Sequence, residues 1–122
     1  MKENDALTER IIGCCFKVHL RLGPGLPERI YQNSLHLEFG QSGLVSIAEK
    51  EFSVYYQDKK VGHLRIDLIV EHKVIVEIKA LTTHLPQVFS YQVLTYLRVS
   101  NLKVGLLVNF GSKSCEVKRL SL

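Results

Sequence analysis

The sequence has none of the features that would set it apart from ordinary globular proteins. Its 122 residues contain no tryptophan, one methionine and only three prolines, and no low-complexity tract interrupts them. No apolar run reaches the length of about 18 residues that a membrane helix needs. The charged first ten residues lack the apolar core of a signal peptide. We therefore predict a single domain over residues 1–122, cytoplasmic and without a membrane partner.

Cysteine is scarce as well. There are three cysteines, an odd number, and Cys14 and Cys15 are adjacent within an apolar helical pattern, which argues against a disulfide framework. No Cys-x-x-Cys or Cys/His spacing indicates zinc, so we expect all three thiols to be buried and inert. Four of the five histidines are not spaced as metal ligands would be, and we expect them at the surface: His36, His63, His72 and His84.

Acidic residues are outnumbered by basic ones. Sixteen Lys and Arg against 12 Asp and Glu give a net charge of +4 and a pI near 9.0. This mild excess favours an anionic partner such as nucleic acid, although many basic proteins bind none.

What the sequence does contain is a clear succession of helix and strand patterns. Helical spacing covers residues 5–22, which "GPG" at 23–25 ends, and continues from Pro27 to about Phe39, where "GQSG" ends it. Pro86 opens a third helix, for which Asn101 is a plausible stop. Strand patterns are found at residues 44–56, 61–70, 74–80, 102–110 and 115–122, with a turn at 57–60 between the first two.

The resulting order is α-α-β-β-β-α-β-β. Short turns make the first three strands antiparallel, whereas the helix at 86–100 connects two strands that should be parallel. The sequence thus predicts an α/β fold with a mixed sheet flanked by helices and an edge strand at the C-terminus.

One hairpin carries charges where a dry interior is expected. In "RIDLIVEHKVIVEIKA" at 65–80, Glu77 and Lys79 share a face because alternate residues of a strand do. A turn at residues 71–73 places Asp67 directly opposite Glu77, while a turn one residue longer or shorter would separate their faces. At about 5 Å and an effective dielectric near 20, the two carboxylates would repel by roughly 3 kcal/mol.

Two interpretations of this charged cluster are open. Alternating acids and bases on a hairpin are usually a solvated face with cross-strand ion pairs. However, residues 74–80 lead into a crossover helix, which makes them an interior strand, and Ile69 and Ile75 share the face of the carboxylates. An interior carboxylate pair with a nearby lysine suits a metal ion and a phosphate group.

Several segments together resemble a known family. Asp67, followed after nine residues by Glu77-Ile78-Lys79, resembles the D…(D/E)-x-K motif of the PD-(D/E)XK nuclease superfamily, although Ile66 stands where that superfamily's name has proline. The segment "HLRLGPGLPERIY" at 19–31 is similar to the hallmark of the GxxExxY family, here Gly25, Glu28 and Tyr31. The segments "YQVLTYL" at 91–97 and "VGLLVNFG" at 104–111 also resemble that family. The resemblance implies a restriction-endonuclease-like αβββαβ core, with an additional N-terminal helix and a C-terminal edge strand.

The resemblance also implies roles for the charged cluster. Asp67, Glu77 and the Ile78 carbonyl oxygen would bind Mg²⁺ or Mn²⁺, because all three are hard oxygen donors. Lys79 would orient or help deprotonate the attacking water and neutralise charge on the phosphate. The alternative is a purely structural ion-pair cluster.

Two further residues are candidates from the same resemblance. Glu28 shares a helical stripe with Tyr31 and Leu35, which predicts that it faces inward and adds an acid to the site; alternatively it caps backbone amides at the start of its helix. Gln92 would lie beside Lys79 from the crossover helix, or merely bond a neighbouring side chain. His19 is expected to cap its helix rather than touch phosphate, and Tyr31 and Tyr96 are expected in the core.

The sequence therefore predicts a metal-dependent phosphodiesterase, with DNA favoured over RNA as its substrate. Two other classes remain open: a nucleic-acid-binding module that does not cleave, and a protein-interaction subunit whose acids are only structural. The short chain leaves little room for a sequence-reading domain, and a homodimer is left open.

Overall fold

The computed structural model describes residues 4–122. Its elements follow the predicted order, with boundaries shifted by at most two residues. The helices are α1 (Asp5–Leu22), α2 (Glu28–Gln41) and α3 (Gln87–Ser100). The strands are β1 (Ser46–Tyr56), β2 (Lys59–Val70), β3 (Val74–Lys79), β4 (Val104–Asn109) and β5 (Glu116–Ser121).

Local chemistry explains where the elements begin and end. The prediction that Pro27 and Pro86 are the first residues of their helices is wrong by one residue. Both have extended backbone conformations and are the N-caps that immediately precede α2 and α3. Asn101 ends α3 with a left-handed conformation at φ 61°, as predicted. Strand β2 begins at Lys59, earlier than predicted, because Gln57 and Asp58 both take positive φ and form a two-residue hairpin turn.

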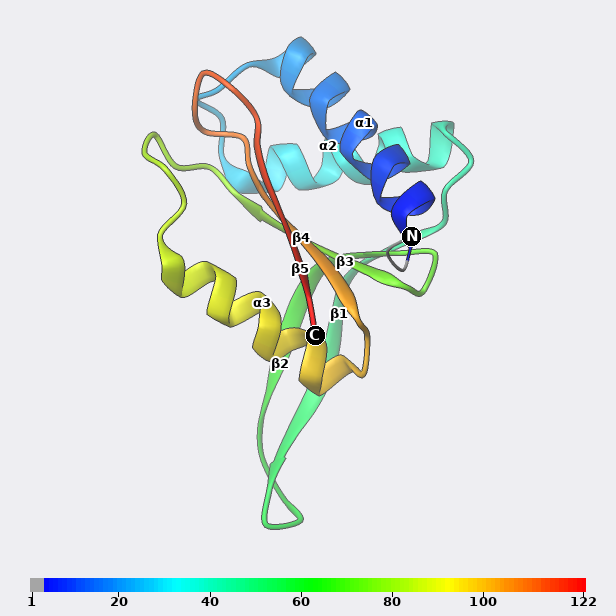
Figure 1. The fold of residues 1–122 in the computed structure, drawn as a ribbon, viewed down its shortest axis with the longest axis vertical. Helices are drawn as coiled ribbons and strands as arrows, with labels where there is room; N and C mark the ends of the chain where they lie inside the picture. Colours follow the sequence, from blue (N-terminus) through cyan, green and yellow to red (C-terminus); the bar gives the residue numbers. More distant parts are fainter. Residues whose placement is uncertain (1–3) are drawn as a thin grey trace.

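The five strands form one mixed sheet in the order β1-β2-β3-β4-β5 (Figure 1). The first three are antiparallel, β3 and β4 are parallel around α3, and β5 pairs antiparallel with β4 at the edge. The predicted strand directions and the αβββαβ core from α2 to β4 are therefore confirmed. Strand β3, which carries Glu77 and Lys79, lies at the centre of the sheet.

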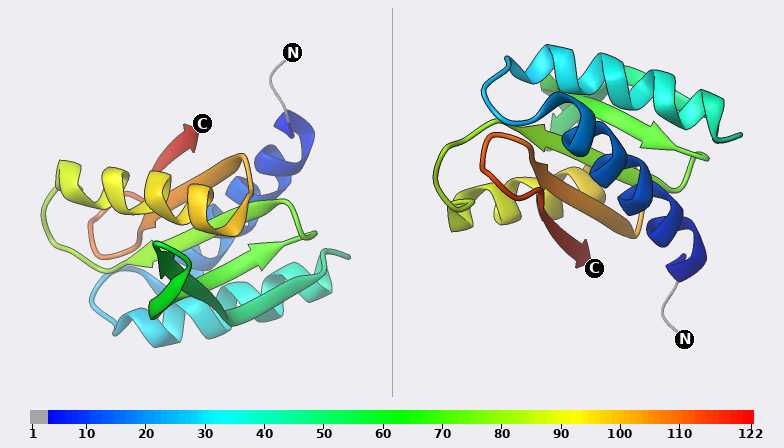
Figure 2. Two further views of the ribbon diagram at one scale, coloured as in Figure 1. Left: turned by 90° about the horizontal axis from the view of Figure 1, so that it is seen from below. Right: turned by 90° about the horizontal axis from the view of Figure 1, so that it is seen from above.

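Helices cover both faces of the sheet (Figure 2). α1 and α2 pack on one face over Val74, Val76 and Ile78, whereas α3 packs on the other face over Ile75 and Leu107. None of the helices described is both long enough and apolar enough to span a bilayer. The alternation along β3 therefore sends Glu77 and Lys79 toward the α3 side.

The predictions for cysteine and histidine are mostly confirmed. Cys14 and Cys15 are buried and no thiol is in a disulfide, but Cys115 is only half-buried, which corrects the prediction that all three are buried. Cys115 lies in the loop before the edge strand β5, where it packs against the margin of the core and stays partly open to solvent. Burial still raises its pKa to about 11, so the thiol stays protonated and inert at neutral pH. The four histidines expected at the surface are exposed.

Candidate active site

The site is formed where β2 and β3 separate. The two strands pair only at Leu68↔Val76, Ile69↔Ile75 and Val70↔Val74, around a turn in which Glu71 and His72 have positive φ. This register is centred on His72, as predicted. The next residues along the two strands are Asp67 and Glu77, so the carboxylates lie at the point where the regular pairing stops.

The two acids replace the missing backbone hydrogen bonds. Asp67 Oδ2 accepts a hydrogen bond from the Ile78 N–H at 2.8 Å, and Glu77 Oε1 accepts one from the Asp67 N–H at 3.4 Å. These buried N–H groups would otherwise have no partner on the neighbouring strand. Each carboxylate is thus held by the backbone of the opposite strand, which brings the two together.

Glu77 is buried, with 4% of its surface exposed. Burial, and next the negative charge of Asp67, raise its pKa to about 9, while the positive charge of Lys79 opposes the shift. The interpretation of a solvated charged face is therefore wrong for Glu77. Without a cation, the pair retains a proton on Glu77 at neutral pH, because two neighbouring buried carboxylates resist ionising together.

Lys79 lies beside the pair and rests on α3. Its ammonium nitrogen is 4.2 Å from the centroid of the Phe89 ring, a cation–π contact. Within residues 4–122 no carboxylate lies within ion-pair distance of it. The Phe89 ring holds the ammonium while leaving its hydrogen-bond donors available.

Glu28 lies at the rim of a cleft in front of Asp67. The cleft has a volume of about 480 Å³ and is lined from α2 and from the β1–β2 hairpin by Glu28, Arg29, Gln32, Glu49, His63, Arg65 and Asp67. Glu28 is exposed, so the prediction that it faces inward is wrong: it is the first residue of α2 and lies beyond the core that Tyr31 and Leu35 enter. Its partial burial raises its pKa, Lys79 lowers it, and Asp67 raises it.

Gln92 and Tyr96 approach the acids from α3. Both are half-buried, and the buried Oε1 atom of Gln92 has no hydrogen-bond partner among residues 4–122. Burial, followed by the charges of Glu77 and Asp67, raises the pKa of the Tyr96 hydroxyl, and a hydrogen bond from Gln92 partly offsets this. Tyr96 packs against the α3-side core as expected, but it also borders the carboxylates, which the sequence alone did not indicate.

His19 and Tyr31 have structural positions away from the acids. The His19 ring is 2.9 Å from the Ser112 carbonyl oxygen, so the predicted helix cap is wrong; α1 ends instead with a bond from the Gly23 N–H to the His19 carbonyl. The ring is buried beside Phe110 and reaches the loop after β4. Tyr31 stacks on Phe110 at 4.7 Å, and its hydroxyl donates to the Gly23 carbonyl, which fixes the "GPG" loop.

Asn109 holds the segment that follows Lys79, a role that sequence reasoning missed. It is fully buried, and its side-chain amide bonds five groups: the N–H of Leu81 and Gly111, the carbonyls of Leu81 and Thr83, and the Ser112 hydroxyl. Gly111 approaches the same segment so closely that a Cβ there would lie 2.3 Å from the Ala80 carbonyl carbon. The available signal was an asparagine at the end of a buried strand, in the segment "NFG" at 109–111.

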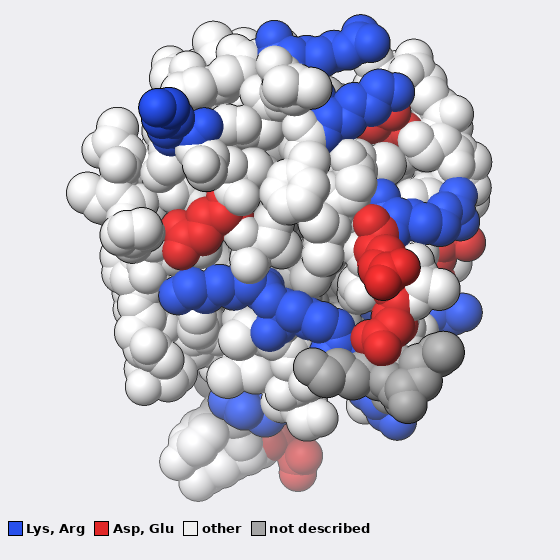
Figure 3. Space-filling model, turned by 45° about the horizontal axis from the view of Figure 1, so that its top comes forward, with Lys and Arg blue, Asp and Glu red and all other residues white. Residues whose placement is uncertain are grey.

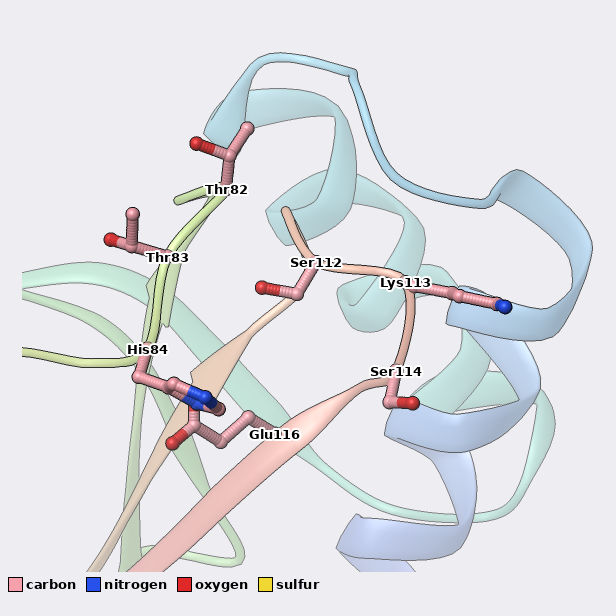
Figure 4. Close-up of a pocket in the computed structure, with 7 residues that line it drawn as sticks. All are labelled: Thr82, Thr83, His84, Ser112, Lys113, Ser114 and Glu116. Carbon is pink, nitrogen blue, oxygen red and sulfur yellow. The ribbon is translucent and has the colours of Figure 1, made fainter.

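A second hollow lies next to this segment (Figure 4). It has a volume of about 460 Å³ and lies between the loop after β3 and the loop after β4. In the figure the Lys113 ammonium points away from the Thr82 and Thr83 hydroxyls, and Glu116 contributes a carboxylate. Its polar groups do not converge on one point, so we assign no ligand to it.

The acidic pair offers oxygen ligands to a metal ion but is not a complete site by itself. Within residues 4–122, no three His, Cys, Asp or Glu side chains are grouped so as to hold a metal by themselves. The Lys79 carbonyl accepts a hydrogen bond from the N–H of Phe110, the residue directly after β4, so the preceding carbonyl, of Ile78, points toward β2 and the acids. Mg²⁺ commonly binds one or two carboxylates and completes its shell with water and phosphate oxygens. Asp67, Glu77 and the Ile78 carbonyl fit that requirement.

Comparison with known proteins agrees with this geometry. The model of the PD-(D/E)XK nuclease superfamily matches residues 5–120. The match covers nearly the whole chain, and the protein therefore belongs to the PD-(D/E)XK nuclease superfamily. No curated protein and no solved structure matches the chain.

Proposed function

We propose that this protein is a metal-dependent phosphodiesterase that hydrolyses DNA. The observation that supports this most directly is the buried Asp67–Glu77 pair at the separation of β2 and β3, with Lys79 beside it. Within the superfamily we assign the chain to the GxxExxY family, on Gly25, Glu28 and Tyr31. We propose DNA rather than RNA as the substrate.

The roles proposed for the residues follow from their positions. Asp67, Glu77 and the Ile78 carbonyl would hold Mg²⁺ or Mn²⁺, which when bound lowers the pKa of a water and neutralises phosphate charge. Lys79, whose ammonium is held on the Phe89 ring, stabilises negative charge that develops on the phosphate. The unpartnered Oε1 of Gln92 accepts a hydrogen bond from the attacking water. Glu28, at the rim of the cleft that Asp67 lines, adds a further acid to the site.

The charged side chains on one face of the molecule are divided into small groups. On the face in Figure 3, Lys and Arg side chains form several separate groups with acidic side chains between them, not one continuous basic patch. On this face, no extended basic surface is available to a nucleic acid.

The proposed function is tested by cleavage of single- and double-stranded DNA and RNA with Mg²⁺ or Mn²⁺. The wild type should cleave, and Lys79→Ala should lose cleavage while it stays folded and still binds metal. Lys79→Arg should cleave little better than Lys79→Ala, because a planar guanidinium does not replace a compact ammonium. Lys73→Ala, which removes an exposed lysine of the β2–β3 turn, is the matched control. Full activity in Lys79→Ala would rule out the proposed mechanism; nucleic-acid binding without cleavage by the wild type would identify a binding module.

A further inference from the structure

A two-stranded arm extends from the body of the protein. Pairing between β2 and β3 stops at Leu68, but β1 and β2 stay paired as far as Tyr56 and Lys59. Residues 49–66, which we call the arm, therefore continue beyond the five-stranded sheet, as Figure 1 shows. Phe52 and Leu64 pack the base of the arm against the α3-side core, while its tip has no third strand. An isolated two-stranded hairpin contributes little to the stability of a fold. A role in binding therefore explains the presence of the tip better than a role in folding.

The tip of the arm presents two tyrosines to solvent. Tyr55 and Tyr56 are 64% and 67% exposed, directly before the Gln57–Asp58 turn. Across the hairpin, Tyr55 pairs with Lys60 and Tyr56 with Lys59. Residues directly opposite on two strands share a face, so each face of the tip carries one tyrosine and one lysine.

Only one of these faces leads to the acidic pair. Along β1, Tyr55 shares its face with Ser53 and Glu51, which pair with His63 and Arg65. His63 and Arg65 line the cleft together with Asp67. A bulge at Val61, where the register shifts by one residue, brings Lys60 to this face. Tyr56 and Lys59 are on the opposite face.

We propose that the Tyr55–Lys60 face of the arm binds unpaired nucleotides of the substrate strand and guides that strand to Asp67. This inference rests on the proposed function, since it takes nucleic acid as the substrate. A tyrosine ring stacks on an exposed base while a lysine contacts the phosphate, a pairing typical of single-strand binding. Bases within a duplex are already stacked on each other and offer no free face to the ring.

Length and charge agree with this partner. From Lys60 to Asp67 the strand spans about 23 Å at 3.3 Å per residue, a distance that several nucleotides cover. Lys60 and Arg65 are exposed on this face. The ion pairs of Arg65 with Glu49 and Glu51, at 3.9 Å and 3.6 Å, are exposed and weak enough for a phosphate to compete. Glu49 and Glu51 offset the charge of Arg65 on this face, so the nucleic acid is favoured as occupant by the pairing of Tyr55 with Lys60 and by the path of the face to Asp67.

The two faces of the arm provide matched variants. Affinity for a fluorescein-labelled single-stranded oligonucleotide is measured in EDTA, so that cleavage does not interfere. Tyr55→Ala should weaken binding about tenfold, the effect of losing one stacked base. Tyr56→Ala, which removes an equally exposed ring one residue away, should change it less than about twofold. Equal losses in the two variants, or none in Tyr55→Ala, would overturn the assignment of the face.

Salt dependence tests the lysine separately. Lys60→Ala should reduce the slope of log affinity against log salt by about 0.7, the value for one contact to a single-strand phosphate. Lys59→Ala should leave the slope unchanged. A duplex of the same length should bind without dependence on Tyr55; a loss in Tyr55→Ala as large as for the single strand would contradict recognition of unpaired bases.

These measurements separate the arm from the catalytic proposal. If the wild type binds the oligonucleotide through Tyr55 but does not cleave it with Mg²⁺, the proposed function fails and the arm assignment stands. If the wild type cleaves the oligonucleotide but Tyr55→Ala binds it like the wild type, the proposed function stands and the arm assignment fails. If the wild type binds no nucleic acid, both fail. A change of oligomeric state in Tyr55→Ala, measured by sedimentation, would show that the face is a contact between two copies instead.

Discussion

At the scale of single residues, the contact between Lys79 and the Phe89 ring fixes the position of a charge that we propose to be catalytic. Its ammonium lies 4.2 Å from the Phe89 ring centroid and outside ion-pair distance of the carboxylates. A cation–π contact in a partly buried place is worth about 1 kcal/mol. Phe89→Leu should therefore slow cleavage about fivefold, whereas Phe89→Tyr, which keeps the ring, should retain the rate.

The comparison of the two Phe89 variants distinguishes positioning from packing. Val88→Ala, which shortens an exposed neighbour on α3, serves as the control and should cleave like the wild type. Cleavage rate and melting temperature are measured for each protein. A loss of rate in Phe89→Leu that simply follows a loss of stability, or an equal loss in Phe89→Tyr, would contradict the role of the ring.

The protonation of Glu77 should be visible in the pH dependence of stability. Its pKa is raised from 4.5 to about 9 in the folded protein, by burial first and then by Asp67. Between about pH 4.5 and 9 the folded state therefore binds a proton that the unfolded state has lost, and this group makes stability fall as pH rises. Urea unfolding in EDTA should show this decrease.

Glu77→Gln, a neutral analogue of the protonated acid, should remove most of that pH dependence. Its free energy of unfolding should stay near that of the wild type at pH 5 and exceed it at pH 9. Glu51→Gln, which changes an exposed acid of β1, should follow the wild-type curve. A Glu77→Gln curve parallel to that of the wild type would mean that Glu77 is ionised in the folded state.

At the scale of elements, the connection from β3 to α3 depends on one amide. Asn109, fully buried at the end of β4, bonds both sides of the segment that follows Lys79. Asn109→Ala would leave several buried groups without partners, so it should lower the free energy of unfolding by about 2–4 kcal/mol. Thermal and urea unfolding provide the measurement.

The same substitution should also affect the site, because the segment sets where Lys79 and Phe89 lie relative to each other. Cleavage at a temperature where Asn109→Ala is fully folded should therefore fall as well. Asn33→Ala, at an exposed position of α2, should change stability by less than about 0.5 kcal/mol. Wild-type stability in Asn109→Ala would show that the loop is held by its other contacts.

At the scale of the whole molecule, metal binding should stabilise the fold. Mg²⁺ or Mn²⁺ should raise the melting temperature of the wild type, because a ligand of the folded state stabilises it by mass action, about 2.7 kcal/mol at 100 times the dissociation constant. The Asp67→Ala/Glu77→Ala variant should lose this response even if its own melting temperature differs. Glu9→Gln/Asp58→Asn, which neutralises two exposed acids elsewhere, should keep it; an equal shift in all three proteins would place the ion at another position.

The sequence by itself determined the order of the elements and the register of the central hairpin. Helical and alternating patterns are local, and Gly23, Pro27 and Asn101 act on the backbone next to them. The turn around His72 sets the pairing of β2 and β3 by its length alone, so the meeting of Asp67 and Glu77 could be predicted without any tertiary contact.

Only the tertiary structure decided how far these side chains are buried and what else they touch. The exposure of Glu28 depends on where α2 extends past the core, and the contact of Lys79 with Phe89 depends on how α3 packs on the sheet. The separation of β2 from β3 replaces backbone pairing with bonds to two carboxylates, and the bulge at Val61 selects which lysine joins Tyr55. These features follow from contacts between segments that are distant in sequence. Local hydrophobic periodicity contains no information about such contacts.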